Sequence, residues 1–330
     1  MKKQFPLLLM GILTVIILFL ASLSTGSLLI PLNTVWSALF GSHSSDHELI
    51  ISSVRLPRTL IALVVGAGMA VAGVCMQALT RNPLASPELL GINQGAALAV
   101  VISLFLLPGS ALWVSHAFAF MGAALAAGFI LLLSSVGGKR LTPLKVVVAG
   151  TAVSLMLGST TQGVLLLNER SIDEMRFWLA GSVAGKGLPQ LLQGMPFIAI
   201  GMIGALLLGK RMNALQLGED MAVGIGMRLE STKRLLFVLI ILLSASCVTI
   251  AGPIAFLGFA VPHIVRGLSG PDYRWIVLHS SLLGAALLLL ADVTSKVIIH
   301  PGEVPVGIMT IFMGAPFFIY LARRKEWKLG

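Results

Sequence analysis

The chain has 330 residues, of which 57% are hydrophobic and only 11% are charged, and its mean hydropathy is +0.97. A water-soluble domain has no core large enough to bury so much apolar surface, so the composition excludes that class and indicates a protein embedded in a bilayer. The net charge of +10 does not indicate a nucleic-acid partner, because the basic residues lie at the ends of apolar runs and form no stripe with interleaved aromatic residues.

Apolar runs long enough to cross a bilayer recur along the whole chain. A spanning helix needs about 20 apolar residues, because the hydrocarbon layer is about 30 Å thick and each helical residue rises about 1.5 Å. The sequence predicts ten such spans, at residues 6–28, 57–79, 91–107, 112–135, 144–167, 190–209, 233–251, 254–268, 276–297 and 304–322. Glycine and alanine are frequent inside these runs, which favours close helix packing in one compact all-α bundle. We therefore expect a single transmembrane domain over residues 1–330.

Lysine and arginine are divided unevenly between the two faces that ten spans create. The face that carries both termini holds 17 of them, and the opposite face holds 6. Because basic connections stay in the cytoplasm, we expect both termini to be cytoplasmic and the protein to lie in the cytoplasmic membrane. The runs that begin at Arg58 and Arg234 resemble each other weakly, and their odd offset in the span order suggests an inverted repeat.

The longest predicted cytoplasmic connection, residues 210–234, is neither a span nor a plain polar loop. Its apolar residues are spaced as in short amphipathic helices, and its glycines allow tight turns or close approach to another molecule. This pattern favours a segment that docks on a cytosolic protein, with a helix lying on the lipid surface as the alternative.

The same connection contains the pattern Leu215-x-Leu217-Gly218-Glu219-x-x-Ala222, followed by Gly226. This pattern resembles the coupling loop of the FecCD family of ABC importer permeases. Further blocks similar to that family follow in order along nearly the whole chain, among them Arg55-Leu56-Pro57-Arg58, Asn82-Pro83-Leu84-Ala85, Gly252-Pro253-Ile254-x-Phe256-x-Gly258, Pro262-His263-x-x-Arg266 and Pro305-x-Gly307.

The resemblance implies a type II ABC importer permease fold, with two permease chains, identical or sister, around one central pathway. It also implies a cytosolic ATPase subunit beneath each permease and an extracytoplasmic substrate-binding protein above them. The chain has no Gly-x-x-x-x-Gly-Lys-Ser/Thr loop, so we expect the ATPase site to belong to a separate subunit and this chain to be no enzyme.

The resemblance also assigns roles to individual residues. The coupling loop implies contacts with the ATPase by Leu215, Leu217, Gly218, Glu219, Ala222 and Gly226. Arg55, Arg58 and Lys296 stand where similar permeases meet glutamates of the binding protein, with simple anchoring of Arg55 and Arg58 at the lipid interface as the alternative. Asn82 and Leu84 stand at an inner gate, and a helix break capped by asparagine is the other interpretation.

Asp292 is the one carboxylate well inside a predicted span. A buried ionisable group of this kind would suit an ion-coupled carrier. Lys296 follows one helical turn later, however, and can neutralise the carboxylate, so we expect a structural role for Asp292. His263, and His300 with Glu303, lack any metal-binding signature, and we expect neither a metal site nor a cofactor.

The sequence therefore predicts the permease subunit of a binding-protein-dependent ABC importer. An iron-siderophore complex is the expected substrate because it is the commonest one in the family that the chain resembles, and haem and cobalamin remain open. An ion-coupled secondary transporter is the less favoured alternative, because such a carrier needs no segment that docks on an ATPase.

Overall fold

The computed structural model describes residues 4–26, 28–41, 45–135, 143–167, 175–176, 178–299 and 302–323. In these ranges the regular structure is entirely helical. The helices long and apolar enough to cross a membrane are α1 (Gln4–Ser24), the continuous run Asp46–Thr80, α6 (Leu112–Ser135), α7 (Pro143–Leu166), α9 (Leu188–Gln216), α11 (Leu229–Ala251) and α13 (Tyr273–Ile298). The shorter helices α5 (Ile92–Leu106), α12 (Leu257–Ser269) and α14 (Val306–Arg323) complete the bundle. Each of the ten predicted spans overlaps one of these helices, and the prediction of an all-α membrane bundle is confirmed.

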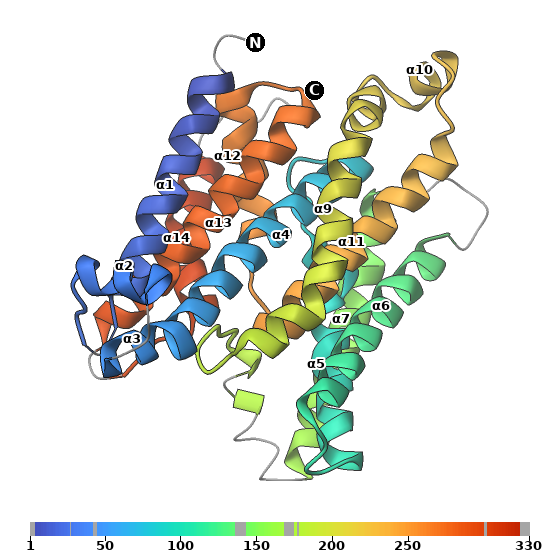
Figure 1. Ribbon diagram of the computed structural model, residues 1–330. Helices are drawn as coiled ribbons and strands as arrows, with labels where there is room; N and C mark the ends of the chain where they lie inside the picture. The colour runs from blue at the N-terminus through green and yellow to red at the C-terminus, as the bar shows by residue number, and fades with distance from the viewer. Residues whose placement is uncertain are drawn as a thin grey trace.

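The helices are arranged in one bundle with a central layer (Figure 1). Helices α1, α12, α13 and α14 lie on one side, α5, α6 and α7 lie on the other, and α4, α9 and α11 run between them. The start of α1 and the short helix α10 (Glu219–Gly224) lie at one end, which we call the α10 end. Helices α2 (Leu32–Phe40) and α3 (Asp46–Ile50) lie at the opposite end, which we call the α3 end.

Two element boundaries differ clearly from the sequence prediction. The second span was expected to begin at residue 57, but α3 continues through a π-helical turn at Ile51–Arg55 into α4 (Leu56–Thr80). The sixth span was expected to end at residue 209, but α9 continues to Gln216. In both places the helix continues through polar or charged residues, which a hydropathy window reads as the end of a span.

The connection between the first two spans carries its own small core. Leu23, Ile30, Val35, Ala38 and Ile51 are buried against one another there. They fix α2 and α3 against the end of α1.

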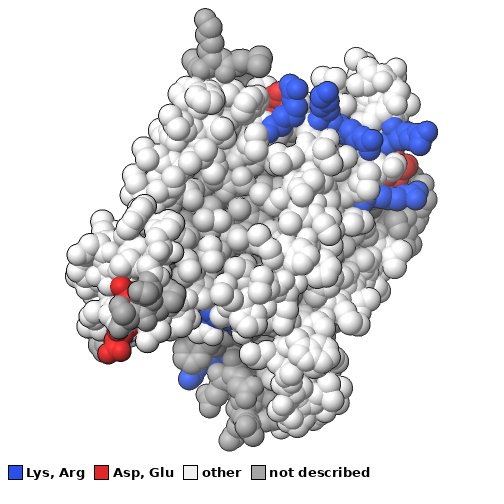
Figure 2. All heavy atoms as spheres, in the orientation of Figure 1, with Lys and Arg blue, Asp and Glu red and all other residues white. Residues whose placement is uncertain are grey.

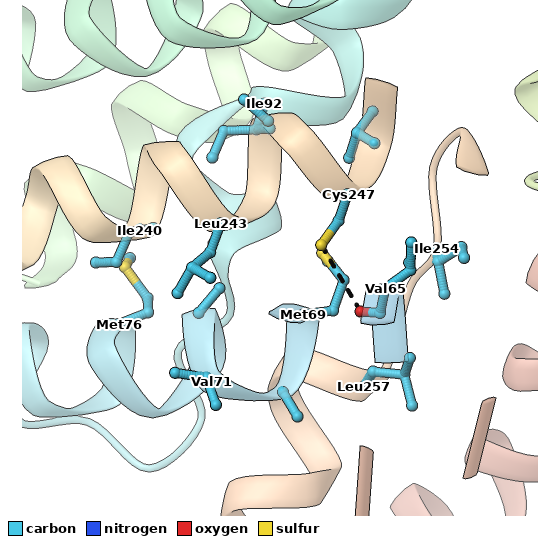
Figure 3. Packing of buried hydrophobic residues seen from close by; sticks show 14 of the residues in the cluster. Val65, Met69, Val71, Met76, Ile92, Ile240, Leu243, Cys247, Ile254 and Leu257 are labelled. Carbon is cyan, nitrogen blue, oxygen red and sulfur yellow. Dashed lines mark hydrogen bonds between the residues drawn. The ribbon is translucent and has the colours of Figure 1, made fainter. Parts of the chain in front are cut away.

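Helix α4 is the centre of the bundle, and it contacts α9, α11, α12 and α13. Figure 3 shows Met69 and Met76 of α4 packed against Leu243 and Cys247 of α11. Cys247 and Cys75 are both buried and free, and they serve as small apolar residues in this packing.

Glycines set the distance between α4 and α13. A Cβ atom built on Gly66 of α4 would collide with the carbonyl oxygen of Gly284 in α13, and a Cβ on Gly284 would collide with the carbonyl of Gly66. The two backbones touch directly, as small residues permit in membrane helices. This contact fixes the distance between the two helices that carry the ion cluster described below.

We expect Gly66→Ala to destabilise the chain by about 1–3 kcal/mol, because the helices must separate to admit one methyl group. Thermal unfolding of the purified protein in detergent measures the effect. Gly163→Ala in α7 is the control, since a Cβ atom there meets no atom within 4 Å. Equal unfolding temperatures for the two variants would show that the α4–α13 contact tolerates expansion.

Candidate functional site

The segment between α9 and α11 forms a short helical projection at the α10 end. Helix α10 lies between two glycines, Gly218 with a φ of 104° and Gly226 with a φ of 84°. Residues with a side chain rarely adopt these angles, so the glycines are required for the chain to turn away from α9 and back into α11.

Two of the apolar residues in this segment anchor it, because Leu215 and Ala222 are buried. Four others point outward and form an apolar surface on the projection. Their exposed fractions are 61% for Leu217, 60% for Met221, 55% for Val223 and 62% for Ile225. An apolar surface of this kind on a short helix suits docking into a groove of another protein. We call these four residues the apolar tip.

Glu219 is engaged within the chain. Its carboxylate accepts a hydrogen bond from Lys233 Nζ of α11 at 2.8 Å, and both side chains are mostly buried. The pair ties α10 to the first turns of α11. A cavity of about 570 Å³ opens beside it, with Arg81, Gly218, Met221 and Phe237 also in its wall.

The turn after α4 contains the residues expected at an inner gate. Helix α4 ends at Thr80, and Arg81 takes a left-handed conformation with a φ of 49°. Asn82 Oδ1 accepts a hydrogen bond from the backbone N–H of Leu84 at 2.9 Å. Asn82 and Leu84 are both half-buried. The bond closes a turn after α4 and caps no helix, because the next helical turn begins at Pro87 with Ser86 at its N-cap. The gating role of both residues stays a prediction.

A buried ion cluster lies at the α3 end, where it joins α1, α4 and α13. Asp292 Oδ1 binds Arg58 Nε at 2.7 Å, and Asp292 Oδ2 binds Lys296 Nζ at 2.6 Å. Arg58 also binds Glu303 with 2.6 Å between Nη1 and Oε2. Ser22 of α1 donates to Asp292 Oδ2 at 2.9 Å. The expected pairing of Asp292 with Lys296 is therefore confirmed, and Arg58 is a partner of Asp292 that spacing along one helix did not indicate.

Arg55 has a different set of partners. Its guanidinium donates to the carbonyl oxygens of Leu23, Ser24 and Leu28 at 2.8, 2.9 and 2.6 Å. These bonds close the connection that follows α1. Arg55, Arg58 and Lys296 are only 6%, 8% and 5% exposed. All three cations expected to meet a binding protein are thus bound by groups of this chain, and their docking role stays a prediction.

Comparisons with known proteins decide which family this arrangement belongs to. The FecCD transport family matches residues 13–324. The chain belongs to the FecCD transport family. It is 43% identical over 294 residues to the "Probable siderophore transport system permease protein YfiZ" of Bacillus subtilis strain 168, covering 88% of this chain and 87% of the relative.

Two further proteins are similar to this member of the FecCD family. The Fe(3+)-citrate import system permease protein YfmD of the same organism is 44% identical over 303 residues, covering 92% of this chain and 90% of the relative. A metal-chelate type ABC transporter solved in an inward-facing conformation has a TM-score of 0.85 at 27% identity, covering 96% of this chain and 98% of that one. The all-helical FecCD fold predicted for the chain is thereby confirmed.

The sequence analysis of this FecCD protein missed three features. Val223 belongs to the apolar tip, Lys233 is the partner of Glu219, and Glu303, considered only beside His300, is a partner of Arg58. A helical-spacing search over residues 219–226 could have found Val223. No local signal indicated the two ion pairs.

The described residues contain no group of three or more His, Cys, Asp and Glu side chains that could hold a metal ion. His300 lies outside the described residues.

Proposed function

We propose that this chain is the transmembrane permease subunit of an ABC importer in the bacterial cytoplasmic membrane, and that it takes up a ferric chelate of the siderophore class. The observation that carries the proposal is the apolar tip, which projects from one end of a ten-helix bundle in a FecCD family member. A chain that transports without an ATP-binding loop needs a separate ATPase, and the tip offers the surface for it.

The charge distribution supports the orientation that this function requires. On the face shown in Figure 2, lysine and arginine gather at the α10 end. Basic residues favour the cytoplasmic side of a membrane protein. The α10 end then faces the cytosol, where the ATPase subunit would bind, and the α3 end faces the extracytoplasmic binding protein.

The contacts of α10 suggest how force would pass from the ATPase to the bundle. Ala222 is buried against the chain, and the Glu219–Lys233 pair joins α10 to α11. Helix α11 packs directly on α4 and α9. A displacement of α10 during ATP binding and hydrolysis would therefore move helices of the central layer. With a second permease chain, identical or sister, across the pathway, such a movement would alternate access to a cavity between them.

The substrate class rests on the relatives. One of them is named for siderophore transport and another for Fe(3+)-citrate import. We propose that this chain likewise passes a bulky ferric chelate delivered by the binding protein. Haem and cobalamin importers are the second candidates.

Uptake of radioactive iron by iron-starved cells tests the proposal. Cells with and without this chain would receive iron bound to a hydroxamate, a catecholate or a carboxylate chelator. We expect uptake of one class to fall to background without the chain and to return when the chain is restored. Unchanged uptake of all three classes would contradict the iron assignment and favour haem or cobalamin. Uptake that depends on the chain but stops with an uncoupler, while cellular ATP is maintained, would contradict the ABC mechanism.

A further inference from the structure

A second cavity at the α10 end, of about 450 Å³, lies between the last turns of α9 and the start of α11. Lys210 and Arg211 of α9 and Arg228 of the α10–α11 connection line it, together with Ser231, Gly226 and Ile225 of the apolar tip. No acidic residue is among its lining residues. The three cations are exposed, and none of them has an ion pair or side-chain hydrogen bond in the part of the chain that the structure describes. The cavity therefore concentrates positive charge that this chain does not neutralise.

The backbone at one wall of this cavity also favours an anion. Arg228 occupies the N-cap position of α11, a helix of 23 residues, and no side chain caps that end. The first N–H groups of a helix lack acceptors within it, and the helix dipole is positive there. Glu230 lies in the same first turn but does not line the cavity, so the start of α11 adds to the attraction that the three side chains create.

Directly beside the cations, α9 presents exposed apolar residues on the same helical face. Leu207 precedes Lys210 and Arg211 by three and four residues, and Ile203 lies one turn earlier. Residues at these spacings share a face of an α-helix. Leu207 is 77% exposed and Ile203 is 59% exposed. This face of α9 is therefore apolar along the bundle and cationic at the α10 end.

Helix α11 repeats this arrangement. Arg228, Ser231, Leu235 and Val238 are separated by three, four and three residues, and both apolar residues are exposed. The two helices lie side by side, because a Cβ on Gly204 of α9 would press on the side chain of Leu239 in α11. Two neighbouring helices thus each offer an apolar strip that leads to the same basic cavity.

We propose that this cavity binds the phosphate headgroup of an anionic phospholipid, with the acyl chains lying along the exposed strips of α9 and α11. Ile225 of the apolar tip borders the cavity, but the apolar strips that lead away from its cations into the bundle favour lipid over the ATPase subunit. Lys210 lies six residues before Gln216, the end of α9, which places it about 9 Å along the helix axis from the start of the α10 segment. A cation at that depth with an apolar strip beneath it matches the charge and polarity profile of a phospholipid. This site does not depend on which chelate the protein transports.

Lipid binding to the purified full-length chain tests the proposal. The chain in detergent would be titrated with dioleoyl phosphatidylglycerol or dioleoyl phosphatidylcholine, and bound lipid would be counted by native mass spectrometry. We expect phosphatidylglycerol to bind at least about fivefold more tightly than phosphatidylcholine, because several cations face its phosphate. The double variant Lys210→Gln/Arg228→Gln should lose this preference.

A matched control removes the same charge elsewhere. Arg234→Gln/Arg323→Gln also deletes two exposed cations, but neither residue lines the cavity. We expect it to keep the preference for phosphatidylglycerol. An equal loss of the preference for phosphatidylglycerol in both double variants would show a general charge effect and would contradict the proposed lipid site. Unchanged unfolding temperatures would establish that all variants are folded.

Two further outcomes would also overturn the proposal. Inorganic phosphate in large molar excess should not displace phosphatidylglycerol, because it lacks acyl chains, and full displacement would identify a site for free phosphate instead. If Lys210→Gln/Arg228→Gln kept its lipid preference but no longer retained the ATPase subunit, the cavity would belong to the ATPase interface.

Discussion

Replacing Asp292 by asparagine is expected to destabilise the chain by about 3–5 kcal/mol, because the change leaves the charges of two buried cations without their shared carboxylate. Arg58 and Lys296 lie within 2.7 and 2.6 Å of Asp292, and Asp292 itself is fully buried. Removing one partner from a buried ion cluster strongly lowers the free energy of unfolding, because it leaves an uncompensated buried charge. Replacing the whole cluster by apolar residues of similar volume often has little effect on that free energy. Thermal unfolding in detergent, together with the amount of protein in the membrane, measures the loss.

Glu303→Gln provides the comparison for this prediction. Glu303 also binds Arg58, but its side chain is 37% exposed, so we expect a loss of about 1 kcal/mol or less. The double variant Asp292→Asn/Lys296→Met should recover part of the loss, because it removes one of the unpaired buried charges. A small and equal effect of Asp292→Asn and Glu303→Gln would show that water reaches the cluster and replaces the carboxylate.

Met221→Asp is expected to abolish ATP-driven uptake while leaving the fold intact. Met221 lies within the apolar tip and is 60% exposed, so the bundle should lose less than about 0.5 kcal/mol. A charge placed in an apolar docking surface must be desolvated without a partner. We expect affinity for the ATPase subunit to fall at least about 30-fold, as for loss of a central apolar anchor.

Retention of the ATPase subunit by the purified permease, measured beside iron uptake in cells, checks this prediction. Met221→Leu keeps the apolar surface and should behave as the unchanged chain does. Asn33→Asp adds the same charge at an exposed position at the α3 end and should also be neutral. If Met221→Asp retained both the ATPase and uptake, the apolar tip would not be the coupling surface. Loss of uptake with normal ATPase retention would place the defect after docking.

The comparison of Glu219 with Lys233 shows what local reasoning could and could not reach. The sequence singled out Glu219 as a charge that could pair with an ATPase. The structure provides Lys233 as its partner, 14 residues later and on another helix. The pairing depends on the turn made at Gly218 and Gly226, which helical spacing alone does not specify. Lys233 therefore had to be found in space.

The sequence by itself determined that the protein lies in a bilayer, where its membrane helices are, and which family it belongs to. Hydropathy over about 20 residues reports directly whether a helix can cross a bilayer, and the pairing of Asp292 with Lys296 followed from one turn of a single helix. These properties are local, so the order of residues is sufficient to predict them.

Only the tertiary structure decided the partners of Arg55 and Arg58 and the basic cavity between α9 and α11. Arg58 and Asp292 are 234 residues apart, and they meet because Gly66 and Gly284 let α4 and α13 touch. Lys210 and Arg228 share a cavity because α9 extends beyond its apolar run and α11 returns beside it. Hydropathy and motif spacing carry no information on which helices touch, since that depends on how all the helix surfaces fit together.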